Sequence, residues 1–169
     1  MDPYSKGAIS KYLEDDHARI DDAFRRATNS EAGIATTAYA EFRGALLRHI
    51  GMEEKILLPA ARSARGGQPL PQAEQLHLDH GALAALLVPT PTTAIVEAIR
   101  AILGAHNRIE EGPGGVYDQC EQLPGIDVDA ILARLKAAPP VAMNPHVDNT
   151  TAMESLRAAL RRAGYSFEL

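Results

Sequence analysis

The chain has one cysteine, no tryptophan and few aromatic residues, and these shortages exclude several kinds of protein. With Cys120 as the single thiol, neither an internal disulfide framework nor a thiolate-bound iron–sulfur cluster is expected. No apolar run approaches the roughly 18 residues of a membrane span, and Met1–Ser10 lacks a signal-peptide pattern. The net charge is −5 and no basic face stands out, which argues against nucleic acid and anionic membranes as partners. We therefore expect a cytoplasmic protein without nucleic-acid or membrane partners.

The residues that are abundant favour helices. Hydrophobic residues make up 46% of the 169 positions, and alanine and leucine dominate them. Apolar residues recur at helical spacing over residues 4–28, 31–64, 71–87 and 91–111, and the last pattern resumes at 116–123 after a Gly-Pro-Gly-Gly break. Short turns join these segments. The pattern predicts an all-α, up-down four-helix bundle over residues 1–123.

Residues 124–169 form a different part of the sequence. A short helix is expected at 127–136, followed by a proline-rich linker. Thr151 and Glu154 have the spacing of a capping box, which predicts a last helix over 152–163, ended by Gly164. We interpret this segment as a helical extension that packs on the bundle or contacts a protein partner, such as a second copy of the chain.

Histidine and glutamate interrupt the apolar stripes of the predicted helices. His49 and Glu53, four residues apart, share a helix face whose other members, such as Leu46 and Leu57, are apolar. A buried charge is costly unless it is paired, hydrogen-bonded or bound to a metal. A histidine takes a position on the apolar stripe of all four predicted helices. The polar members of the stripes are His17, His49, Glu53, His80, His106 and Glu110.

This recurrence favours a metal site over isolated core histidines. One histidine on an apolar stripe is usually satisfied by a backbone carbonyl, but four histidines and two glutamates fit that explanation poorly. Imidazole and carboxylate suit iron, manganese or zinc, and six donors exceed the need of one tetrahedral zinc ion. We predict a dinuclear site with the histidines as terminal ligands and the glutamates as bridges. Asp16 and Asp79 are expected to be solvated, with a supporting role behind the ligands as the alternative.

Four motifs resemble the hemerythrin HHE cation-binding family. The segment HIGMEEKILLP, residues 49–59, is very similar to the second helix of that family, and residues 13–20, 78–80 and 105–111 resemble the other three. The resemblance implies a four-helix bundle with a non-haem, usually diiron, centre bridged by two carboxylates and oxygen. Members of the family bind dioxygen, handle peroxide or nitric oxide, sense oxygen or iron, or store metal.

Two departures from the oxygen-carrying members bear on the chemistry. The oxygen carriers have a further histidine where this chain has Leu76, so one metal here would gain an open or water-filled position. An open position favours reactivity over reversible oxygen carriage. The last carboxylate of the oxygen carriers comes five residues after the histidine, so Glu111 competes with Glu110, which we assign by analogy with Glu53. His77 is a replacement ligand or a solvated or supporting histidine. The further candidates as ligands or supporting groups are His77, Glu111 and Glu54.

The sequence thus predicts a hemerythrin-like protein with two iron ions bridged by oxygen or water, iron being expected ahead of manganese or zinc. Its small ligand would be dioxygen, peroxide or nitric oxide, in sensing or stress defence. Catalase-like peroxide turnover and metal storage without redox turnover are the alternatives, so whether the chain is an enzyme stays open. Tyr12, Tyr39 and Tyr117 are expected in the core or at an interface, and the sequence does not select which of them approaches the site.

Overall fold

In the computed structural model, which describes residues 6–169, the regular elements are helices, and no strand occurs within that range. The predicted all-α class is therefore confirmed. None of the helices between residues 6 and 169 is long and apolar enough to cross a membrane. Tyr4, where the first predicted helix begins, lies outside the described residues. The elements are α1 (Ala8–Thr28), α2 (Thr36–Met52), the π-helical turn η1 (Glu53–Leu57), α3 (Leu58–Ala64), α4 (Ala73–Leu86), α5 (Thr93–Glu111), α6 (Val116–Glu121), α7 (Val128–Lys136) and α8 (Thr150–Arg162).

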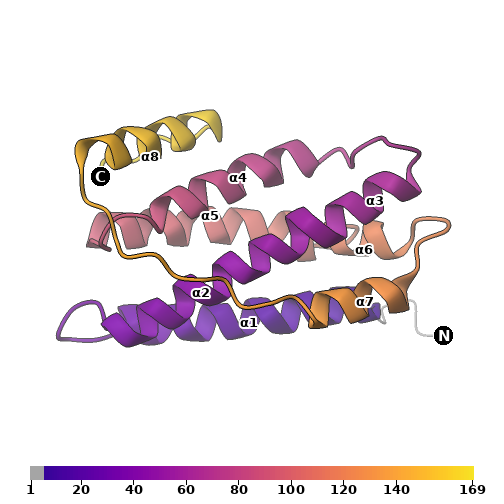
Figure 1. Ribbon diagram of the computed structural model, residues 1–169, viewed down its shortest axis with the longest axis horizontal. Helices are drawn as coiled ribbons and strands as arrows, with labels where there is room; N and C mark the ends of the chain where they lie inside the picture. The colour runs from indigo at the N-terminus through magenta and orange to yellow at the C-terminus, as the bar shows by residue number, and fades with distance from the viewer. Residues whose placement is uncertain (1–5) are drawn as a thin grey trace.

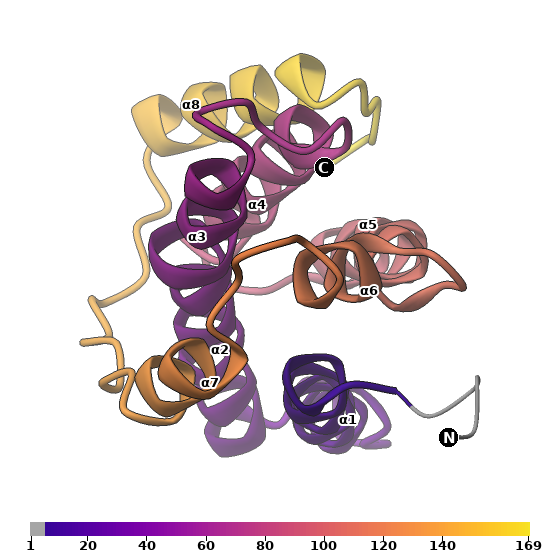
Figure 2. The same cartoon turned by 90° about the vertical axis from the view of Figure 1, so that its right-hand side faces the viewer.

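Four helical rods form an up-down bundle. α1, the continuous rod α2–η1–α3, α4 and α5 run alternately in opposite directions (Figure 1), and the end-on view shows them around a common interior (Figure 2). The short connections explain this order, because loops of a few residues join antiparallel neighbours. The predicted four-helix bundle is confirmed. The second rod starts at Thr36 rather than near Glu31, since Gly33 adopts a left-handed φ of +100°.

The second rod passes through Pro59 without a break by widening its hydrogen-bond pattern. In η1 the amide of Leu58 bonds to the carbonyl of Glu53, five residues back. Proline lacks an amide hydrogen and crowds the carbonyl four residues before it, and the wider turn accommodates both effects. The wider turn adds one residue to the repeat, and the next fully buried residue after Leu57 is Ala61. Glu53 and Glu54 both lie in this π turn.

Two apolar clusters fill the bundle, one on each side of a polar layer. The first cluster lies toward the α1–α2 and α4–α5 connections, and α8 closes it; the second contains residues of α6, and α7 closes it. On each helix the core histidine lies about one turn from a residue of the first cluster on one side and from a residue of the second cluster on the other. The four histidines therefore form a polar layer between the two clusters. The first cluster includes Ile20, Phe24, Phe42, Leu46, Leu83, Ile99, Ile102, Leu156 and Leu160. The second includes Ile9, Leu13, Met52, Leu57, Leu76, Val116, Tyr117, Cys120, Ile131 and Leu135.

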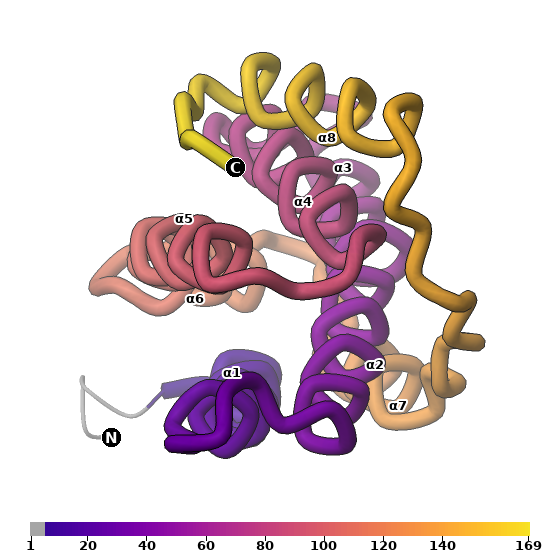
Figure 3. The backbone as a smooth tube through the Cα atoms, turned by 90° about the vertical axis from the view of Figure 1, so that its left-hand side faces the viewer, coloured from indigo at the N-terminus to yellow at the C-terminus, as the bar shows by residue number. Residues whose placement is uncertain are grey.

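The C-terminal segment lies along the outside of the bundle. α7 packs against α1 and η1, and α8 packs against α4. Residues 137–149 connect them along the outer side of α2, as Figure 3 shows. Two arginines of α2 hold this connection through its carbonyls: Arg48 Nε donates to Ala138 at 2.9 Å, and Arg43 Nη1 donates to Asn144 at 2.7 Å. The tail helices thus complete the two apolar clusters.

The last helix begins slightly earlier than predicted. The side chain of Asn149 caps α8 by accepting a hydrogen bond from the amide of Ala152 at 2.8 Å. The predicted cap at Thr151 is wrong, because asparagine caps a helix at least as well as threonine and lies two residues earlier. Gly164 follows the helix with a φ of +86°, as expected for a glycine stop.

Candidate metal centre

The polar layer brings together all six side chains that the sequence singles out as ligands. Each of them is at most 8% exposed, although each is ionisable. Their nitrogen and oxygen atoms form two adjacent groups, and within each group the atoms lie within 4.8 Å of one another. The first group is His17, His49, Glu53 and Glu110. The second group is Glu53, His80, His106 and Glu110.

Both glutamates belong to both groups, with one carboxylate oxygen facing each. Glu53 Oε1 lies 3.4 Å from His49 Nε2, whereas Glu53 Oε2 lies 3.0 Å from His80 Nε2. A carboxylate placed in this way has one oxygen available to each of two neighbouring ions. The matching contacts of Glu110 run from Oε2 to His17 Nε2 at 3.3 Å and from Oε1 to His106 Nε2 at 3.0 Å.

The second group has the donor set and spacing that a transition metal requires. Glu53 Oε2 and Glu110 Oε1 are buried and accept no hydrogen bond within the described part of the chain. His80 Nε2 and His106 Nε2 also face each other at 3.1 Å. Two donors at right angles, each about 2.1 Å from a metal, lie about 3 Å apart. An ion at the common point would satisfy these orphaned atoms, so the residues fit a bound metal.

Each imidazole is oriented from behind by a carboxylate. All four Nδ1 atoms contact an aspartate or glutamate, and all four Nε2 atoms face the two groups. A carboxylate only accepts, so Nδ1 is the donor, and Nε2 is left to bind an ion. Each carboxylate comes from the helix next to that of its histidine. The pairs are His49 with Asp16 at 2.7 Å, His80 with Glu54 at 2.7 Å, His106 with Asp79 at 3.2 Å, and His17 with Glu111.

The expectation that Asp16 and Asp79 are solvated is wrong. They are 6% and 1% exposed, and they take the alternative supporting role behind the histidines. A residue next to a core histidine lies about 100° around the helix, and here that direction faces a neighbouring helix rather than water. Asp79 also accepts hydrogen bonds from Gln75 at 2.8 Å and from Tyr165 at 3.0 Å, which connects the C-terminal tail to the site.

The charges and the burial of the site raise the pKa values of several of its own groups. Burial disfavours a charged His49, but Glu53 and Asp16 outweigh burial and raise its pKa to about 10. Burial likewise opposes the charge of His106, and Asp79 and Glu110 raise its pKa to about 10. For Glu110, burial first and the neighbouring Glu53 carboxylate second raise the pKa. Protons therefore compete with cations for these atoms, and metal binding must release protons.

We expect Asp16→Ala to weaken metal binding about 10- to 100-fold, because His49 would lose the carboxylate that orients its ring. Competition with a chromogenic chelator measures the change in apparent affinity. Asp15→Ala is the matched control, since that side chain is 57% exposed and, among residues 6–169, forms its ion pair with Lys11. An equal loss in both variants would contradict the orienting role of Asp16.

The structure also places the remaining candidates. Glu54 and Glu111 lie behind His80 and His17 rather than between the two groups. The side chain of His77 is 74% exposed, and its Nδ1 contacts Glu54 Oε2 at 3.1 Å, outside both groups. The sequence named all four supporting carboxylates as candidates for this role, but it did not pair each of them with its histidine. Their pattern is visible in the sequence: aspartate precedes histidine at 16–17 and 79–80, and paired glutamates occur at 53–54 and 110–111.

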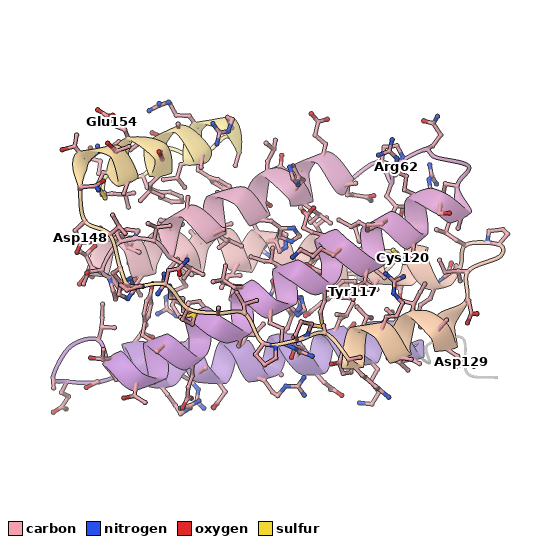
Figure 4. All side chains as sticks on the ribbon, viewed as in Figure 1. Arg62, Tyr117, Cys120, Asp129, Asp148 and Glu154 are labelled. Carbon is pink, nitrogen blue, oxygen red and sulfur yellow. The ribbon has the colours of Figure 1, made fainter. Side chains whose placement is uncertain are left out.

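Tyr117 is the tyrosine that approaches the site, a choice that the sequence left open. It is 1% exposed, and Figure 4 shows it in the interior of the bundle. Its hydroxyl lies among the atoms of the first group and donates to Glu53 Oε1 at 2.5 Å. Tyr39 instead lies in the first apolar cluster. Cys120, the single thiol, is 1% exposed in the second cluster.

A cavity of about 200 Å³ reaches the site from the side of the first cluster. All four imidazoles and Glu53 line it, and Phe24, Leu46 and Leu83 contribute apolar walls. Tyr117 is absent from the lining and lies with the second cluster. Drug-sized ligands occupy pockets of roughly 300–1,000 Å³, and a water molecule takes about 30 Å³. The cavity therefore suits a small molecule.

The comparisons with known proteins agree with this geometry. Residues 8–113 match a family model described as the hemerythrin HHE cation binding domain. The matched range contains the six side chains of the two groups and ends before α6. No curated protein and no solved structure matched the chain.

Proposed function

Because the chain belongs to the hemerythrin HHE cation-binding domain family, we propose that it is a non-haem diiron protein that binds or reacts with dioxygen or a related small ligand, in sensing or stress defence. The observation that carries this proposal is the pair of donor groups that share Glu53 and Glu110. Two imidazoles and two shared carboxylates per group suit iron better than a tetrahedral zinc site, whose four ligands belong to one ion.

In this proposal the histidines would hold the metals terminally and the two glutamates would bridge them. Bound iron would supply electrons and open positions for a small ligand. The four supporting carboxylates keep each Nε2 directed at the site, so little reorganisation is needed when an ion binds. Part of the cavity wall is apolar, and its size would admit dioxygen, peroxide or nitric oxide.

Iron analysis of the purified chain tests the proposal directly. We expect about two iron ions per chain and an absorption spectrum that changes when the reduced protein meets air. The measurement is metal quantitation by mass spectrometry, together with spectra recorded before and after exposure. One zinc ion per chain, or no metal after loading with ferrous iron, would contradict the diiron assignment.

Catalase-like peroxide turnover is the second candidate, and Leu76 is the observation that favours it. Leu76 lies one turn before His80 on the buried stripe of α4 and is 1% exposed, so the second group has only two imidazoles. An ion there would keep a position for peroxide. Oxygen release after peroxide is added to the iron-loaded protein would support turnover. A stable coloured adduct without turnover would support binding or sensing.

A further inference from the structure

The hydroxyl of Tyr117 lies at the centre of the first donor group. It is 3.2 Å from His17 Nε2 and 3.2 Å from His49 Nε2. It is also 2.5 Å from Glu53 Oε1 and 3.1 Å from Glu110 Oε2. These four atoms are the ones that the first group offers to an ion. An oxygen within 3.2 Å of all four therefore occupies the same small volume as that ion's ligands.

The fold holds Tyr117 in this position from two directions. Before it, Gly115 packs so closely on the end of α5 that a Cβ atom there would lie 2.4 Å from the carbonyl oxygen of Glu110. After it, the carboxylate of Glu121 caps the start of α1, accepting hydrogen bonds from the amide of Ile9 at 2.7 Å and from the Ser10 hydroxyl. α6 is thus anchored to both α5 and α1, and the tyrosine ring has little freedom to leave the site.

Hydrogen bonding alone does not account for this arrangement. A phenol has one proton, which Tyr117 donates to Glu53, so its contact with the second carboxylate, Glu110 Oε2, has no proton of the phenol to share. Tyr39 is a useful comparison: it is also buried, yet its hydroxyl has no hydrogen-bond partner among residues 6–169. The chain therefore tolerates a buried tyrosine without surrounding it by donors. The setting of Tyr117 is specific to the metal centre.

We propose that Tyr117 is a further metal ligand, whose phenolate oxygen binds the ion held by His17 and His49. This inference rests on the proposed diiron function. On binding, the phenolic O–H bond breaks, the oxygen lone pair forms the bond to the metal, and the proton leaves to solvent without any change of oxidation state. Tyrosinate is an established ligand of ferric iron in proteins.

The charges around Tyr117 oppose ionisation of the phenol as long as no cation is bound. Burial and the carboxylates of Glu53 and Glu110 raise the pKa of Tyr117 well above its usual value, so the protein's own groups keep the phenol protonated. A multivalent cation reverses that preference, because it stabilises the anionic oxygen directly. The ion of the first group would then have five protein donors and the ion of the second group four. Small ligands entering from the cavity would meet the less saturated second ion.

Ferric-loaded wild type, Tyr117→Phe and Tyr39→Phe test the proposal together. We expect the wild type and Tyr39→Phe to show a phenolate-to-iron charge-transfer band in the visible range, with tyrosinate vibrations in the resonance Raman spectrum. Tyr117→Phe should lose both signals while keeping its iron. Identical spectra for wild type and Tyr117→Phe at equal iron content would overturn the ligation.

Iron per chain, measured on the same samples, separates the two proposals. A wild type that binds no iron would overturn the diiron function and, with it, the ligation by Tyr117. A wild type that binds two iron ions but shows no tyrosinate vibrations would overturn the ligation alone. This second outcome depends only on the wild type, so the test stands even if Tyr117→Phe does not fold.

Discussion

Glu53→Ala is expected to abolish iron binding at both groups, from about two ions per chain to essentially none. One oxygen of Glu53 faces His49 in the first group, and the other faces His80 in the second. The substitution would therefore remove a ligand from each proposed ion, and it takes away the carboxylate oxygens that face Nε2 of His49 and Nε2 of His80. Metal quantitation after loading measures the loss, and circular dichroism checks that the helices remain.

Two control variants test whether the loss of iron is specific to Glu53. Glu41→Ala removes the same side chain from the same helical rod, but Glu41 is 53% exposed and its ion pair in the described part of the chain is with Arg26, so both ions should remain. His77→Ala should also keep both ions, because its exposed ring lies outside the two groups. If Glu53→Ala still held one ion, Glu53 would serve a single group, and the shared-carboxylate assignment would be refuted.

Phe42→Ala is expected to destabilise the fold by about 3–5 kcal/mol. Phe42 is fully buried in the first apolar cluster, with its ring 4.5 Å from that of Phe24 and 5.8 Å from that of Tyr39. Removing the ring loses its burial and leaves a cavity that the surrounding helices fill only in part. The free energy of unfolding of a domain is about 5–15 kcal/mol, so this loss would be a large share of the total.

Urea unfolding followed by circular dichroism measures the Phe42→Ala loss, and the melting temperature should fall by roughly 6–20 °C. Val147→Ala is the matched control, since that apolar side chain is 41% exposed and its truncation should change stability by less than about 0.5 kcal/mol. A change below 1 kcal/mol for Phe42→Ala would show that the first cluster repacks freely, contrary to its tight ring contacts.

The sequence predicted the polar layer because helical periodicity alone determines which side chains face the interior. His17, His49, His80 and His106 each replace a leucine-like position on a stripe, and four such stripes meet in a bundle. The spacing of four residues then carries Glu53 and Glu110 into the same layer. These six positions follow from local pattern plus one assumption about packing, and the structure brings them together as that assumption requires.

The parts that periodicity did not predict depend on contacts between helices. Asp16 and Asp79 look like surface charges on their own helices, and only the adjacent helix shows that they are buried. Tyr117 lies beyond a Gly-Pro-Gly-Gly turn whose geometry no helical pattern fixes. In each case a neighbouring segment decided the outcome.

The sharing of Glu53 and Glu110 has a mechanical consequence. α1 with α2–α3 and α4 with α5 are two helical hairpins, and each metal group takes three side chains from one hairpin and a single glutamate from the other. Neither hairpin holds a complete group by itself. A bound ion would therefore act as a cross-link between the hairpins, and amide hydrogen exchange along both should slow together on metal loading. Ligation by Tyr117, which follows the second hairpin, would add another tie into the first group.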